Sequence, residues 1–187
     1  MAMQELKGEQ VVLHDRTFDR FIPYEELCAV TGRLADRINA DYRTNDRPPI
    51  IVGVLTGAFM FCSELVRRIT VPCELAFVRV SSYSGTASTG HVREVMGLQE
   101  SICDRDVIVV EDIVETGHSM HRLLELLEVH HPASIRTAVL LAKPSALCEQ
   151  VPLDYVGMEL PEGFLVGFGL DYDGLGRNLP DIYRERV

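Results

Sequence analysis

The stretch from Val107 to Met120, VIVVEDIVETGHSM, constrains the fold of this chain more than any other. Its first four residues, Val107 to Val110, are β-branched and apolar, which is typical of a strand buried on both faces. A small polar turn, Glu115 to Ser119, comes next, and apolar residues then recur at helical spacing. The stretch therefore predicts a buried strand, an acidic pair at its end, a short loop and a helix.

The loop and the acidic pair, Glu111 and Asp112, suit a phosphorylated sugar. A polar loop before a helix presents free backbone N–H groups and the positive end of the helix dipole to a phosphate, and Gly117 lets the backbone approach closely. The two carboxylates would repel a phosphate, so we interpret them as acceptors for sugar hydroxyls or as ligands of a divalent cation. The pattern indicates a ribose 5-phosphate; the alternative is an ordinary strand and helix joined by a polar turn.

A second strand, turn and helix precede this stretch and have the same order. The apolar run Ile50 to Leu55 enters the turn Thr56-Gly57, and a helix is expected from there to Ile69, followed by a strand over residues 73–80. A helix over 118–130 and a strand over 135–142 would complete the second unit. Alternating strands and helices predict a parallel sheet covered on both faces, with ligands at the carboxyl ends of its strands.

Length, charge and cysteine content narrow the class of protein. The chain has 187 residues and a formal net charge of −10, which disfavours nucleic acid and anionic membrane as partners. No apolar window approaches the length of a membrane span, and no signal peptide is visible in residues 1–10. The five cysteines are scattered, which argues against a disulfide framework or a zinc site. We therefore expect one domain in the cytoplasm.

The stretch 107–120 resembles the phosphoribosyl pyrophosphate (PRPP) signature of type I phosphoribosyltransferases. Residues 10–183, with the segments DYVGMELP and FLVGFGLDYDGLGRNLP, resemble the hypoxanthine-guanine branch of that family. The resemblance implies an α/β fold with a parallel twisted sheet flanked by helices and a small hood formed by the termini. It places the core at about 23–145, the hood at about 10–15 plus 150–187, and a lid at about 81–101.

The implied activity is purine salvage, in which PRPP and hypoxanthine or guanine give IMP or GMP and pyrophosphate. Mg²⁺ is the implied cofactor, and a homodimer or homotetramer is the implied assembly, for which the apolar faces of the early helices are candidate contacts. The residues carried over are, for PRPP, Glu111, Asp112, Ile113, Val114, Thr116, Gly117, His118 and Ser119; for pyrophosphate, Thr56, Gly57 and Arg177; for the purine, Lys143, Phe164 and Leu165; for the lid, Ser82 and Tyr83; and for the metal, Asp171, Glu111 and Asp112.

The purine end of the implied site has the clearest roles. Lys143 would donate to the purine O6 and select 6-oxopurines over adenine, Phe164 would stack on the base, and Leu165 would offer backbone groups to its edge. Read without the resemblance, these are a solvated lysine and core residues. Glu115 would be the acid/base partner near N7, where the family commonly has aspartate in the pattern EDxxDTG. Thr56 is a second departure, because many relatives have a basic residue there.

Other functions stay open at this point. An adenine phosphoribosyltransferase would not need a lysine donor to O6, and an orotate enzyme would need an added cation for the substrate carboxylate. A regulator of the same fold could bind PRPP or a nucleotide without catalysis, which the change to Glu115 favours. An RNA-binding regulator would want a basic face, which the net charge of −10 counts against.

Overall fold

The computed structural model describes residues 8–79 and 101–186. The two residues predicted for the lid, Ser82 and Tyr83, lie outside the described residues. In the described part of the chain, no helix is both long and apolar enough to cross a membrane.

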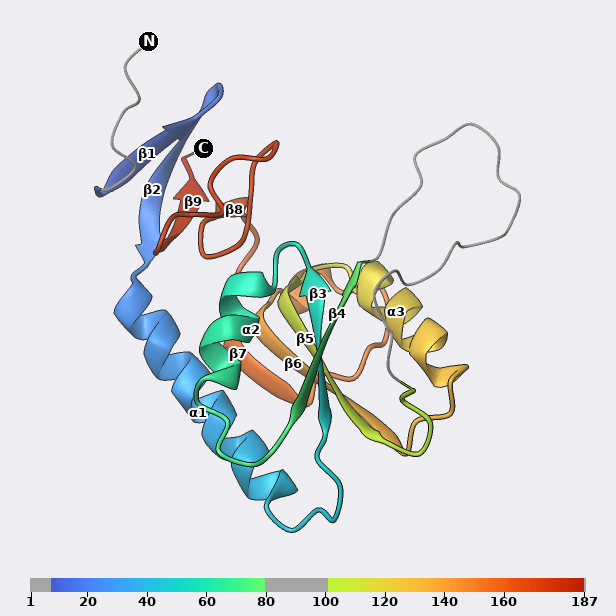
Figure 1. Cartoon of the computed structure of the whole chain (residues 1–187). Coiled ribbons are helices and arrows are strands. Elements are labelled where there is room, and N and C mark those ends of the chain that lie inside the picture. The colour runs from blue at the N-terminus through green and yellow to red at the C-terminus, as the bar shows by residue number, and fades with distance from the viewer. Residues whose placement is uncertain (1–7, 80–100, 187) are drawn as a thin grey trace, which may run out of the picture.

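A parallel sheet of five strands forms the centre of the molecule, as predicted (Figure 1). Its strand order is β4-β3-β5-β6-β7, and every neighbouring pair is parallel. The strands are β3 (Ile50–Leu55), β4 (Glu74–Arg79), β5 (Asp106–Val114), β6 (Ser134–Ala142) and β7 (Tyr155–Glu159).

Helices cover both faces of this sheet because the side chains of its strands alternate between the faces. Ile51, Ile108 and Val110 pack with helices α1 (Tyr24–Tyr42) and α2 (Phe59–Val66). Val107 and Val109 pack on the other face with α3 (His118–Glu128). The continuous apolar runs of the sequence are thereby explained, since both faces of β3 and β5 are buried. A short 3₁₀ helix, η1 (Pro144–Ala146), follows β6.

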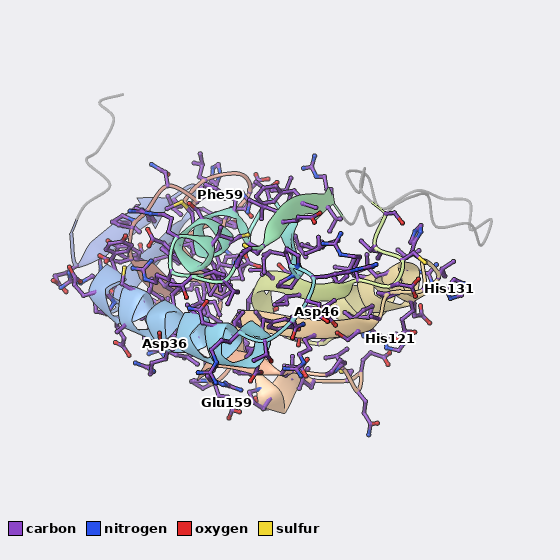
Figure 2. The ribbon with its side chains drawn as sticks, turned by 60° about the horizontal axis from the view of Figure 1, so that its bottom comes forward. Asp36, Asp46, Phe59, His121, His131 and Glu159 are labelled. Atoms are coloured by element: carbon purple, nitrogen blue, oxygen red, sulfur yellow. The ribbon has the colours of Figure 1, made fainter. Side chains whose placement is uncertain are left out.

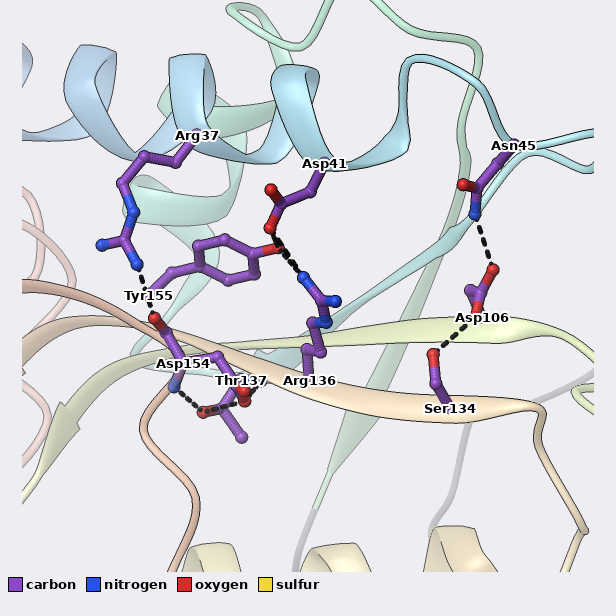
Figure 3. A network of polar contacts seen from close by, with 9 residues as sticks. All are labelled: Arg37, Asp41, Asn45, Asp106, Ser134, Arg136, Thr137, Asp154 and Tyr155. Carbon is purple, nitrogen blue, oxygen red and sulfur yellow. Dashed lines mark hydrogen bonds and ion pairs between the residues drawn. The ribbon is translucent and has the colours of Figure 1, made fainter.

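Polar side chains fasten α1 to the edge of the sheet (Figure 3). The Asp41 carboxylate accepts hydrogen bonds from the Tyr155 hydroxyl and from Arg136, each at 2.6 Å, and Arg37 donates to the backbone carbonyl of Asp154 at 2.8 Å. The apolar side chains of α1 are buried in the molecule's own core. That face is therefore not available for contact between subunits, whereas the exposed Asp36 points outward from the helix (Figure 2).

The two ends of the chain form a second, antiparallel sheet in the order β1-β2-β9-β8 (Figure 1). Its strands are β1 (Gln10–Leu13), β2 (Arg16–Ile22), β8 (Leu165–Val166) and β9 (Ile182–Glu185). This hood differs from the expected range at both ends. Residues 16–22 belong to it because β2 pairs with both β1 and β9, whereas β7 belongs to the parallel sheet because the buried Tyr155 pairs with Ala138 of β6.

Candidate active site

The carboxyl ends of β3 and β5 lie next to each other and point toward the hood (Figure 1). β3 ends at the turn before α2, and β5 ends at the loop before α3. The edge of a parallel sheet outside these strand ends is the usual ligand site of such folds. The residues predicted for phosphate, pyrophosphate and ribose therefore meet at one place.

A pocket of about 190 Å³ opens at the end of β5. Thr116, Gly117 and Ser119 of its lining lie where α3 begins, and the backbone N–H groups of a first helical turn have no partner within the helix. Most of the residues predicted for PRPP line it, and Met120, which was predicted only as a core residue of the helix, lines it as well. The lining residues are Glu111, Ile113, Val114, Glu115, Thr116, Gly117, Ser119 and Met120.

The segment after η1 holds the loop of this pocket in place. The backbone N–H groups of Cys148 and Glu149 both donate to the carbonyl oxygen of Thr116, at 3.0 and 3.2 Å. Gly117 has a φ of 86°, which favours glycine, and a Cβ atom there would make a tight contact of 3.2 Å with the carbonyl oxygen of Glu149. His118 Nδ1 lies 3.1 Å from the Glu149 carboxylate, and this side chain is not part of the pocket lining.

The acidic pair is divided between the pocket and the neighbouring turn. Glu111 lines the pocket, whereas the Asp112 carboxylate packs against Gly57 and accepts a hydrogen bond from the N–H of Ile113 at 2.9 Å. Burial and the neighbouring Asp112 raise the pKa of Glu111 well above its usual value. Burial raises the pKa of Asp112 too, against the lowering effects of its hydrogen bonds and of Arg177. Partners that donate hydrogen bonds or carry positive charge would stabilise the ionised form of both carboxylates and so lower their pKa values.

The predicted pyrophosphate turn is closely packed against the acidic pair and the hood. The Leu55–Thr56 peptide bond is cis. A Cβ atom at Gly57 would lie 2.0 Å from Oδ2 of Asp112, and one at Gly169 would lie 2.0 Å from the carbonyl oxygen of Gly57. Arg177 reaches the same place, where it donates to the carbonyl of Gly169 at 2.7 Å. Three separate segments therefore meet at this turn.

Asp171 and Arg177 form an ion pair of 2.6 Å. The other carboxylate oxygen of Asp171 accepts a hydrogen bond from the N–H of Gly174 at 2.8 Å, which closes a tight turn between them. Among the residues that the structure describes, no group of three or more His, Cys, Asp and Glu residues is arranged to hold a metal ion. The predicted metal residues Glu111, Asp112 and Asp171 therefore do not form a complete metal-binding site by themselves.

Lys143 lies at the end of β6, and its ammonium group is buried beside Glu115. Lys143 is 5% exposed, and its Nζ donates to the Glu115 carboxylate and, at 2.6 Å, to the carbonyl oxygen of Gly163. Half of the Glu115 side chain is exposed. The expected purine donor and the expected acid/base group are thus brought together, and Lys143 also binds the segment that leads into β8.

The predicted base-stacking residue lies on the hood. Phe164 is 38% exposed, and the neighbouring Leu165 is buried in β8. The Phe164 ring contacts Phe18, Tyr172 and Arg16, with centroid distances of 6.0, 5.6 and 5.5 Å. Sequence reasoning missed these three neighbours because Arg16 and Phe18 belong to no motif, and Tyr172 received no role although it lies in the segment FLVGFGLDYDGLGRNLP.

Comparison with known proteins agrees with this geometry. The phosphoribosyl transferase domain family matches residues 23–173. The chain is 37% identical to a hypoxanthine phosphoribosyltransferase of Salmonella typhimurium, over 89% of this chain and 94% of that protein. It is 41% identical to a hypoxanthine-guanine phosphoribosyltransferase of Staphylococcus epidermidis, over 84% and 86% of the two chains. A solved glutamic acid mutant, from an analysis of an invariant aspartic acid in hypoxanthine phosphoribosyltransferases, superposes with a TM-score of 0.82 at 36% identity, over 89% and 94%.

Proposed function

Because the chain belongs to the phosphoribosyltransferase family, on its hypoxanthine-guanine branch, we propose that it transfers the 5-phosphoribosyl group of PRPP to hypoxanthine or guanine. The products are IMP or GMP and pyrophosphate. The observation that carries the proposal is the position of Glu115. Its carboxylate lines the phosphate pocket and also pairs with the buried Lys143, so one residue joins the expected ribose phosphate site to the expected purine site.

The ribose 5-phosphate fits the pocket at the end of β5. The N–H groups of residues 116–119 and the dipole of α3 would bind the 5-phosphate, and Thr116 and Ser119 would add hydroxyl donors. Glu111 and Asp112 would accept hydrogen bonds from the ribose hydroxyls and orient the anomeric carbon. These hydrogen bonds would add donors to the backbone N–H groups that already bind the buried acidic pair.

The leaving pyrophosphate fits the cis turn between β3 and α2. In the transfer, N9 of the purine attacks the anomeric carbon as the bond to pyrophosphate breaks, and negative charge collects on the leaving oxygen. The backbone amides at Thr56 and Gly57 and the guanidinium of Arg177 would stabilise that charge. Thr56 brings no positive charge of its own, so Arg177 would be the cation that the chain itself provides there.

The purine fits between Lys143 and the hood. Lys143 would donate to O6 of hypoxanthine or guanine, and adenine, which carries an amino group at that position, would be rejected. Phe164 would stack on the base, and Leu165 would offer backbone groups to its edge. Glu115 would exchange a proton with N7 as N9 bonds to the ribose, and general acid–base help of this kind is typically worth about 10²–10⁴-fold.

Mg²⁺ fits the donors present, provided that the substrate supplies most of the ligands. Protein sites for Mg²⁺ commonly use one or two carboxylates together with substrate phosphates and water. Asp171 would be such a carboxylate, and Glu111 and Asp112 would act from the ribose side. Bound there, the ion would neutralise charge on the pyrophosphate.

We also propose that the enzyme works in the cytoplasm as a homodimer or homotetramer, with neither nucleic acid nor membrane as partner. The net charge of −10 disfavours binding to nucleic acid and to anionic membranes. Size-exclusion chromatography with light scattering would give the mass of the assembly. A monomer at working concentrations would contradict the proposed oligomer.

The test of the function is pyrophosphate release from PRPP in the presence of Mg²⁺. Hypoxanthine, guanine, xanthine and adenine are offered separately, beside a control without base. Turnover with hypoxanthine or guanine and none with adenine is the expected result. Release that does not depend on the base would show hydrolysis of PRPP instead, and no release with PRPP still bound would identify a binding protein.

A further inference from the structure

The N-terminal hairpin contacts the proposed site although it lies outside the family match, which begins at residue 23. We call residues 10–18 the hairpin arm. They comprise β1, the turn at His14 and Asp15, and the start of β2. The arm is anchored by its own small core, in which Val11, Leu13 and Phe18 are buried.

The arm holds the turn that connects Asp171 to Arg177. The Tyr172 hydroxyl donates to the Asp15 carboxylate at 2.8 Å, and Nε2 of His14 lies 3.3 Å from the carbonyl oxygen of Asp173. Leu13 packs so closely on Gly176 that a Cβ atom there would lie 2.9 Å from its Cδ1. The turn is thereby fixed from the outside as well as by the ion pair inside it.

The arm also sets the position of the Phe164 ring. The guanidinium of Arg16 lies over the rings of Tyr172 and Phe164, with its central carbon 4.7 and 5.5 Å from their centroids. Tyr172 meets Phe164 edge-on at an interplanar angle of 85°. Arg16 is itself held by Glu185 of β9 at 3.2 Å. A cation over an aromatic ring is attracted by its π electrons, so Arg16 restricts the position of the Phe164 ring, which stays 38% exposed.

We propose that the hairpin arm positions the purine-binding side of the site, and that Arg16 is the residue through which it acts on Phe164. This inference rests on the proposed function, in which the exposed part of Phe164 stacks on the base. Arg16 contacts the Phe164 ring, on whose exposed part the base is proposed to stack, so the effect of Arg16 should fall on purine affinity. The phosphate pocket is lined entirely by residues 111–120 and should not respond.

The test is steady-state kinetics of Arg16→Met, which removes the charge and keeps a flexible stem. We expect KM for hypoxanthine to rise roughly threefold to tenfold, in line with a lost cation–π contact, while KM for PRPP changes less than twofold. Arg16→Lys should recover part of the loss, since a lysine keeps the cation but not the planar group. Tyr172→Phe removes only the hydroxyl that binds Asp15 and tests the same arm without altering Arg16.

Arg20→Met is the matched control. Arg20 lies on the same strand with a side chain 39% exposed, against 40% for Arg16, and it too pairs with a glutamate. Among the described residues, Arg20 forms no hydrogen bond, ion pair or cation–π contact with Phe164 or Tyr172; its polar partners are Glu9 and Asp181. We expect this variant to keep both KM values, with any loss limited to thermal stability.

The possible outcomes distinguish a failure of the proposed role of the hairpin arm from a failure of the proposed transferase function. A wild-type protein that does not transfer ribose phosphate to hypoxanthine would overturn both. Wild-type turnover with an unchanged hypoxanthine KM in both Arg16→Met and Tyr172→Phe would overturn the inference alone. Equal KM changes for Arg16→Met and Arg20→Met would also overturn it, because a general weakening of the hood would then explain the result.

Discussion

The phosphate pocket takes its whole lining from residues 111–120, whereas the groups proposed for the purine come from β6, from the segment before β8 and from loops that the hairpin arm supports. The first half of the site is local. A strand end, a left-handed glycine and a helix N-terminus produce it wherever they follow one another. The second half exists only when segments distant in sequence are packed together. Variants should therefore affect the two halves separately.

The largest effect is expected where the two halves meet, at Glu115. Glu115→Gln keeps the shape but cannot exchange a proton with N7, so kcat should fall about 10²–10⁴-fold with little change in either KM. Glu115→Asp should retain at least wild-type activity, because aspartate is the common residue of the family at this position. Steady-state kinetics with PRPP and hypoxanthine measure both.

Glu125→Gln is the control for Glu115, since Glu125 lies on α3 with the same 49% side-chain exposure and outside the pocket lining. Its kinetics should match the wild type. A loss in Glu115→Asp as large as in Glu115→Gln would show that the site is built around the longer side chain, which reaches Lys143.

The next largest effect should be weaker binding of the purine with no change in the binding of PRPP. Lys143→Met removes a buried ammonium that donates to Glu115 and to Gly163. A hydrogen bond from a charged donor contributes about 1.5–3 kcal/mol, so KM for hypoxanthine should rise roughly tenfold to a hundredfold. KM for PRPP is the internal control and should stay near the wild-type value. An equal rise in both would mean that Lys143 supports the phosphate loop as well.

The pyrophosphate turn connects the half of the site that is built from consecutive residues to the half that is built from distant segments. In Gly57→Ala the new Cβ would lie 2.0 Å from Oδ2 of Asp112, and overpacking of this kind costs about 1–3 kcal/mol of stability. We also expect a higher KM for PRPP, because Asp112 must move. Chemical denaturation and kinetics measure the two effects.

Gly32→Ala is the matched control for Gly57→Ala. Gly32 lies in α1, and a Cβ atom there would have nothing within 4 Å. Its replacement should leave activity unchanged and stabilise the protein by about 0.5–1 kcal/mol. Similar losses in both variants would exclude the packing explanation.

The smallest effect concerns the acidic pair of the local half. The pKa of Glu111 is raised in the folded protein, so the folded state holds this proton more tightly than the unfolded state does. The free energy of unfolding should therefore fall as pH rises from about 4.5 through the raised pKa. Urea unfolding of the ligand-free protein between about pH 5 and pH 8 measures it.

Glu111→Gln should remove this part of the pH dependence and be more stable than the wild type at the upper end of the range, because it has no carboxyl group to ionise there. Glu159→Gln, at the exposed end of β7 (Figure 2), should keep the wild-type slope. A wild-type stability that is flat over this range would contradict the raised pKa.

Much of the fold and of the phosphate half could be predicted from residues alone. The apolar run Val107 to Val110 and the spacing of Met120, Leu123, Leu124 and Leu127 indicated β5 and α3 within a few residues. Family resemblance then located Lys143, Phe164 and Arg177 in the chain. It gave no contacts for them, and the second strand of the hood, β2, was not predicted.

The sequence by itself determined what depends on neighbours along the chain: the buried strands, the glycine before α3 and the acidic pair at the end of β5. Only the tertiary structure decided that Asp112 turns to Gly57, that Lys143 pairs with Glu115, and that Arg16 lies over Phe164. Strands and helices can be predicted from short stretches of sequence because their hydrogen bonding and burial repeat every few residues. The direction of a side chain at a strand end depends on what packs against it, and here those partners come from segments tens of residues away.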